Sequence, residues 1–134
     1  RGGTGEFGAT GVYAIRDLPT DAQVLLYGSV LAGMTPDSPP VGGAKNNPMH
    51  PVAWLRQRPL PGGGVQRIFA TTMGAADDWS SEDLRRLFLN ASLWTLGLEK
   101  KIPTKGLEAG MLGVWDPTSF GFGGFRRGLF PTPR

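Results

Sequence analysis

Side chains that can bind a polar ligand gather between Thr71 and Trp79. Threonine hydroxyls and neighbouring carboxylates can hydrogen-bond a polyol or, with other groups, hold a hard cation. An indole ring can stack on a sugar through its apolar face. The candidate ligand-binding residues of this stretch are therefore Thr71, Thr72, Gly74, Asp77, Asp78 and Trp79. A purely structural role for the two aspartates stays open, because acidic residues favour the N-terminus of any following helix.

His50 is the single histidine of the chain and lies in a proline-rich loop between Met49 and Pro51. A lone histidine cannot by itself form a metal site, and triad chemistry requires a nucleophile placed beside it. The chain has no cysteine, which excludes disulfides, thiolate catalysis and cysteine-ligated metals. We keep His50 as a candidate ligand-binding residue, with an ordinary loop histidine as the alternative. No catalytic set, metal site or cofactor is predicted.

The composition is that of one small domain with long loops. The chain has 134 residues, of which 21 are glycine and 12 proline, while the hydrophobic 40% clusters in separate segments instead of being diluted. The net charge of +3 comes from scattered basic residues, so no nucleic-acid binding is predicted. No run approaches the ~18 apolar residues of a transmembrane segment. The N-terminus also lacks the pattern of a signal peptide.

Four apolar runs predict the strands that position these side chains, and they cover residues 11–16, 24–31, 51–58 and 65–72. The near-continuous hydrophobicity of residues 24–31 is typical of a strand covered on both faces in an α/β sheet. Residues 59–64 predict the turn of a hairpin. Ligands bind beyond the carboxyl ends of strands in such sheets, which favours the stretch that follows residue 70.

A long loop, a glycine-rich start and one helix complete the predicted domain. Residues 32–51 form a loop broken by prolines and glycines, and loops of this length tend to be functional or mobile. The glycine-rich start, residues 1–10, is predicted to be a connector, with a ligand-cradling loop as the alternative. Residues 81–98 predict a helix that is capped by Ser80 or Ser81 and ends near Gly97. Its wide apolar stripe predicts that it is mostly buried.

The C-terminal segment, residues 105–134, is rich in glycine, proline and phenylalanine. We interpret it as an extended tail whose aromatic rings pack on the domain or on a partner chain. Its Phe122 to Arg127 portion is also similar to RNA-binding segments in which bases stack on Phe and Arg. One unrepeated copy favours the packing interpretation.

Several motifs in order resemble the closing section of ThuA-like (trehalose-utilisation) domains. They are Pro51-Val52-Ala53-Trp54, then the strand ending in Thr72-Met73-Gly74, and then a helix with the pattern L-R-R-L-x-x-N-A-x-x-W from Leu84. The resemblance implies an α/β domain at residues 1–104 that is the C-terminal portion of a flavodoxin-like sheet, related to class I glutamine amidotransferases. It also implies a role in sugar metabolism and a periplasmic or secreted location.

Two departures from the family pattern bear on activity. A complete family domain is longer, and its first strands and the position of the amidotransferase nucleophile would lie before Arg1. Either a missing N-terminal half or another protein chain is then expected to complete the sheet. Many relatives also have Gly-His where this chain has Gly74-Ala75, so the imidazole that would serve as a general base is absent.

The leading hypothesis is a sugar-associated ThuA-like domain without catalysis of its own, which binds a small ligand or serves as an accessory module of a larger protein. The competing hypothesis is a structural or interaction subunit of a multi-protein assembly. A third is a carbohydrate hydrolase or isomerase that takes its catalytic residues from the missing half.

Overall fold

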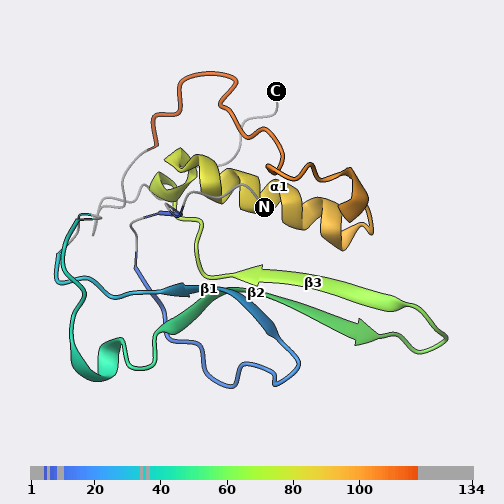
Figure 1. Ribbon diagram of the computed structural model, residues 1–134, viewed down its shortest axis with the longest axis horizontal. Helices are drawn as coiled ribbons and strands as arrows, with labels where there is room; N and C mark the ends of the chain where they lie inside the picture. The colour runs from blue at the N-terminus through green and yellow to red at the C-terminus, as the bar shows by residue number, and fades with distance from the viewer. Residues whose placement is uncertain (1–4, 6, 9–10, 34, 36, 118–134) are drawn as a thin grey trace, which may run out of the picture.

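The computed structural model describes residues 5, 7–8, 11–33, 35 and 37–117 as a mixed α/β unit (Figure 1). Three strands, β1 (Gln23–Gly28), β2 (His50–Pro59) and β3 (Val65–Thr71), form one antiparallel sheet in the order β1-β2-β3. The helix α1 (Glu82–Thr95) lies along one face of this sheet. Short 3-10 turns occupy Gly43–Lys45, Asp77–Ser80 and Glu99–Lys101.

The hairpin of β2 and β3 confirms the sequence prediction. The strands pair without interruption from Ala53 opposite Thr71 to Pro59 opposite Val65. The turn between them is closed by hydrogen bonds from Leu60 N to Gly64 O (3.1 Å) and from Gly63 N to Leu60 O (3.1 Å). The glycines of the turn have positive φ, which residues with a Cβ adopt only at a cost.

The strand predicted within residues 24–31 exists as β1, but the prediction that both of its faces are covered is wrong. The side chains of β1 alternate between exposed and half-buried, because α1 packs over one face only. Its pairing with β2 is antiparallel and carries two register shifts, between Val24 and Tyr27. Alternation of exposed and half-buried side chains is typical of an antiparallel strand that has one face in water.

The strand predicted at residues 11–16 does not form, and these residues run as an irregular segment beneath the face of the sheet opposite α1 (Figure 1). Val12 contacts the sheet, since a Cβ built on Gly28 would lie 3.1 Å from its methyl groups. Tyr13 is exposed. Val12 and Ile15 are half-buried, and the segment makes no ladder with a neighbouring strand among the described residues.

The helix begins and ends where the sequence places its signals. Ser81 is the N-cap and accepts a hydrogen bond from Leu84 N at 3.2 Å. At the C-terminus, Gly97 N donates to Trp94 O (3.0 Å) and Leu98 N to Leu93 O (2.8 Å), the two bonds of a Schellman motif around a glycine with φ of 74°.

The prediction that the helix is mostly buried is wrong. Asp83, Leu84 and Ala91 are its buried residues, whereas Leu89 is 42% exposed. The reason is that a single sheet faces α1, where Phe88 meets Phe69 of β3 edge to face at 5.5 Å between ring centroids. On the side away from the sheet, an irregular segment that includes Leu107 and Ala109 covers only part of the helix within the described chain.

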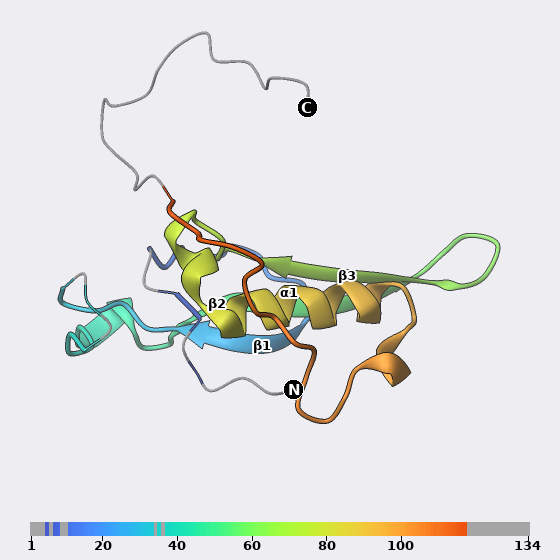
Figure 2. The same ribbon diagram turned by 90° about the horizontal axis from the view of Figure 1, so that it is seen from above.

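Residues 105–109 cross α1 on its side away from the sheet (Figure 2), and the chain then arches away from the helix (Figure 1). Arg86 Nε donates to Leu107 O (3.0 Å) and Arg85 Nε donates to Ala109 O (2.6 Å). The segment is thus attached to the helix by backbone carbonyls. The Gly/Phe-rich centre of the predicted tail, residues 121–125, lies outside the described residues. Within the described part of the chain, no helix is both long and apolar enough for a membrane span.

Candidate functional site

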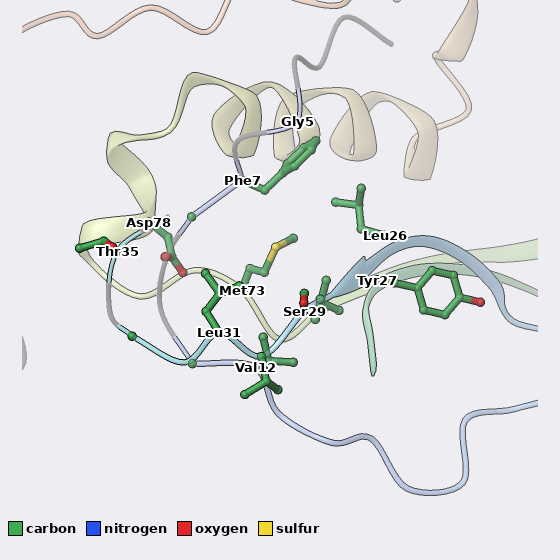
Figure 3. A pocket seen from close by; sticks show the side chains of 16 residues that line it. Gly5, Phe7, Val12, Leu26, Tyr27, Ser29, Leu31, Thr35, Met73 and Asp78 are labelled. Carbon is green, nitrogen blue, oxygen red and sulfur yellow. The ribbon is translucent and has the colours of Figure 1, made fainter. Parts of the chain in front are cut away.

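A cavity of about 500 Å³ opens at the end of the sheet where β1 and β3 finish and β2 begins (Figure 3). Its walls come from the N-terminal residues between Gly5 and Val12 that the structure describes, from residues 26–31, from Val52, and from Met73 and Asp78. This volume is in the range of ~300–1,000 Å³ found for small-molecule sites. Segments distant in the sequence therefore meet around one space.

Asp78 supplies a buried carboxylate to this wall, with 3% of its surface exposed. Its Oδ2 accepts hydrogen bonds from Gly74 N (3.0 Å) and Ala75 N (3.1 Å), and its own N donates to Ala75 O (3.0 Å). The carboxylate thus holds the loop after β3 in a tight turn. Two backbone donors on one oxygen compensate part of the cost of removing a charge from water.

The glycine-rich N-terminus reaches the same carboxylate. A Cβ built on Gly8 would lie 2.4 Å from Asp78 Oδ1, and the φ of Gly8 is 133°. Both observations require glycine at this position. Nearby, Gly5 N donates to Asp83 Oδ2 at 2.9 Å, at the first turn of α1. The segment predicted as a connector therefore forms part of the wall.

The remaining wall is mainly apolar. Phe7, Leu26 and Met73 lie together between α1 and the end of β1, and the ring of Tyr27 points away from them (Figure 3). Ser29 and Thr35 add hydroxyl groups, of which Thr35 Oγ1 is 2.9 Å from Ser38 Oγ. An apolar cavity with few polar groups is typical of a site that binds small organic molecules.

Of the seven residues predicted to bind a ligand, Asp78 is the one that lines the cavity. Thr71 Oγ1 donates to Val52 O (2.7 Å) and accepts from Met73 N (3.0 Å), so it fastens the end of β3 to β2. The buried Oγ1 of Thr72 has no hydrogen-bond partner among the described residues. Gly74 and Asp77 are exposed on the adjacent loop.

Trp79 and His50 also lie at this end of the sheet and outside the cavity wall. Trp79 packs on Phe88 at 4.7 Å between ring centroids, and its Nε1 donates to Gly74 O at 3.3 Å. His50 was predicted in a loop, which is wrong, because it is the first residue of β2 and pairs with Gly28. The predicted loop ended too late, because the prolines, glycines and asparagines before His50 give no signal of the residue at which the strand begins.

Sequence reasoning missed Phe7, Leu26 and Met73 as lining residues. Phe7 is the single aromatic side chain among the glycines of residues 1–10, which was a usable signal for an anchored segment. Leu26 and Met73 carry no local signal of a site, because an apolar side chain at a strand end is equally consistent with a core position.

A separate polar cluster fastens the other end of α1. Arg67 Nη1 donates to Glu99 Oε2 (2.6 Å) and to Trp94 O (2.9 Å), and its guanidinium lies 5.5 Å from the Trp94 ring centroid. The hydrogen bond from Arg67 lowers the pKa of Glu99, and the same bond raises the pKa of Arg67. This cluster has a structural role, since Arg67 bonds the Trp94 carbonyl at the helix C-terminus.

The described residues define a mixed α/β unit with a cavity at one sheet end. Within residues 5–117, gaps aside, no three His, Asp or Glu side chains come close enough together to hold a metal ion. Comparison of the chain with protein-family models, with curated proteins and with solved structures gives no match.

Proposed function

We propose that this chain is a small-ligand-binding module, without catalysis of its own, and that the cavity takes a hydroxylated molecule such as a sugar. The observation that carries the proposal is the cavity of about 500 Å³ that segments distant in the sequence form at one end of the sheet. Ser29 and Thr35 bring hydroxyl groups to its wall, and a hydroxyl can both donate to and accept from a hydroxylated ligand. The resemblance to sugar-associated ThuA-like domains favours the same ligand class.

The side chains that line the cavity favour an accessory, ligand-binding role without catalysis. Asp78 is the one ionisable side chain other than Tyr27 among the described lining residues. Hydrolysis of a glycosidic bond usually requires a pair of carboxyl groups on either side of it. In the weaker alternative, a missing N-terminal half supplies the second group and makes the complete protein a hydrolase or isomerase.

We also propose that the sheet is the C-terminal part of a larger flavodoxin-like, class I glutamine amidotransferase-like sheet in an extracytoplasmic protein. The motif order around β2, β3 and α1 supports this, and so do the outer edges of β1 and β3, which pair with no other strand among the described residues. Intact-mass measurement of the native protein tests the proposal. A native mass equal to 134 residues, together with a monomeric protein, would contradict it.

Binding is tested by titrating D-glucose and trehalose into the protein and following its thermal unfolding and the heat of binding. At a ligand concentration ~100 times Kd, the native state gains ~2.7 kcal/mol relative to the unfolded state. The variant Asp78→Asn weakens the hydrogen bonds from Gly74 N and Ala75 N that hold the loop beside the cavity, so we expect it to weaken binding at least tenfold. The matched control is Asp77→Asn, because Asp77 is exposed and lies outside the wall.

The result that contradicts this function is equal binding by the two variants, or no binding of either sugar to the unchanged protein. Circular dichroism of both variants shows whether the loop held by Asp78 has been lost.

A second candidate is the interaction subunit, and one surface favours it. Leu112 and Val114 are fully exposed on a segment held to the rest of the unit through Ala109 O and through the bond from Trp115 Nε1 to Ala76 O (3.1 Å). Exposed apolar side chains on a tethered segment are typical of a protein contact. Replacing both with serine should release a co-purifying partner from the native assembly and leave sugar binding unchanged. A partner that stays bound would contradict this candidate.

A further inference from the structure

The outer edge of β3 carries backbone N–H and C=O groups that pair with no strand among the described residues. At the end of the pairing with β2, Thr72 N donates to Val52 O at 3.0 Å. Because hydrogen-bonded and non-hydrogen-bonded residues alternate along an antiparallel pair, the even-numbered residues of β3 bond to β2. The residues whose N–H and C=O groups point outward are therefore Val65, Arg67, Phe69 and Thr71.

The edge of β3 lacks the features that usually protect an edge strand from other strands. Proteins block such edges with prolines, bulges or charged side chains. β3 contains no proline, it pairs with β2 without a register shift, and its one charged residue is Arg67. The guanidinium of Arg67 is drawn toward α1, where it donates to Glu99 and to Trp94 O. The other edge strand, β1, carries two register shifts between Val24 and Tyr27, which bend a strand.

We propose that β3 pairs antiparallel with β3 of a second copy of this chain, so that the two sheets join across a two-fold axis. Such an interface uses the same surface of both copies. In the register that overlaps the whole strand, Ile68 lies at the axis and opposite Ile68 of the second copy. Arg67 then lies opposite Phe69, and Val65 lies opposite Thr71. Each of these outward-pointing pairs exchanges backbone hydrogen bonds in both directions.

The side chains of β3 are complementary to themselves in this register. Arg67 and Phe69 both lie on the face that α1 covers, since they contact Trp94 and Phe88 of the helix. A guanidinium group beside an aromatic ring is a favourable neighbour. Ile68 is half-buried on the opposite face, so an isoleucine across the axis buries more of it. A register shifted by two residues places Arg67 opposite Arg67, and like charges directly opposite are destabilising.

This inference goes beyond the proposed ligand binding and does not depend on it. No residue of β3 belongs to the described cavity wall, so the site and the edge are separate surfaces. The outer edge of β1 stays available for the strands of the proposed larger sheet. Dimer formation can therefore fail while ligand binding succeeds, and the reverse also holds.

Sedimentation velocity of the unchanged protein over a dilution series tests the dimer. We expect a reversible dimer with a Kd on the order of 10 μM, because one strand pair is a small interface. Ile68→Lys places two ammonium groups opposite each other at the axis and should raise this Kd at least tenfold. Leu25→Lys is the matched control, because Leu25 is a partly exposed residue of the other edge strand. A monomer at every concentration up to ~1 mM, or a dimer that Ile68→Lys leaves unchanged, would overturn the proposal.

A cysteine variant tests the register without adding charge, and it decides the matter if Ile68→Lys does not fold. The chain has no cysteine, so Ile68→Cys introduces the single thiol of each copy. Residues opposite each other in a non-hydrogen-bonded pair have the closest side chains of an antiparallel ladder, which suits a disulfide. Mild oxidation should give a covalent dimer of Ile68→Cys and leave Leu25→Cys monomeric. Absence of the covalent dimer, or equal cross-linking of the two variants, would contradict pairing through β3.

Discussion

The two ends of the sheet use glycine for different physical reasons. At the cavity end, a Cβ on Gly28 would lie 2.7 Å from Val52 Cγ1, and one on Gly8 would strike Asp78. At the hairpin end, Gly62, Gly63 and Gly64 have positive φ and no atom within 4 Å of a built Cβ. Glycine therefore allows close approach of segments at one end and a turn conformation at the other. The end where segments approach closely, which we call the dense end, is the one that holds the cavity.

The burial of α1 also decreases from the cavity end of the sheet to the hairpin end. Its first turn, with Asp83 and Leu84, is buried beside the loop that Asp78 holds. Beyond its last turn, Leu96 is 71% exposed, and there the Arg67–Glu99 pair fastens the chain to β3. Burial is greater at the first end, whereas a surface ion pair and the bond from Arg67 to Trp94 O hold the other.

The largest effect is expected for Leu84→Ala. Leu84 is fully buried at the dense end, so its truncation should lower the free energy of unfolding by ~2–5 kcal/mol through lost burial and a residual cavity. Urea unfolding measures the change. Leu89→Ala, on the same helix and half-exposed, is the control and should cost much less. Similar losses of unfolding free energy in the two variants would contradict tighter packing at the dense end.

A smaller effect, with a direct contrast between the ends, is expected for two glycine variants. Gly28→Ala should lower the free energy of unfolding by ~1–3 kcal/mol, because Val52 and Val12 must move to admit the methyl group. It should also weaken ligand binding, since Gly28 lines the cavity.

The hairpin counterpart, Gly63→Ala, should cost about 1 kcal/mol from backbone conformation alone and leave binding unchanged. Urea unfolding and calorimetry of both variants provide the comparison. If the two substitutions have equal effects on stability and on binding, the distinction between close approach and turn conformation fails.

Removal of the helix cap should have a moderate effect. Ser81→Ala deletes the acceptor of the Leu84 N–H at the start of α1, for which ~1 kcal/mol of unfolding free energy is expected. Ser80→Ala is the control, since Ser80 precedes the cap. Thermal unfolding measures both variants, and an unchanged midpoint for Ser81→Ala would show that the dense end does not depend on its cap.

The smallest effect is expected at the exposed end of α1, for Glu99→Gln. Because Arg67 lowers the pKa of Glu99, the pair stabilises the folded state above the ordinary glutamate pKa, and this contribution is lost as pH falls through the lowered value. The midpoint of thermal unfolding should therefore differ slightly between Glu99→Gln and the unchanged protein at neutral pH and converge at acid pH. A difference that persists at acid pH would exclude the ion pair as its cause.

Local signals predicted the elements that need only neighbouring residues. The Pro59–Gly64 turn between two apolar runs gave the hairpin, and Ser81 with Gly97 gave the limits of the helix. The contact of Gly8 with Asp78 joins residues 70 positions apart, and no spacing rule connects them. The exposure of α1 was missed because an apolar stripe does not reveal whether a second layer covers it.

The central claim is that the cavity end of the sheet binds a small ligand, and an NMR titration of the amide-labelled protein with trehalose tests it most directly. The account predicts saturable shifts of the amide signals of Gly8, Gly28 and Met73, with unchanged signals for Gly62, Gly63 and Gly64. Unchanged signals throughout, or shifts confined to the hairpin, would contradict it.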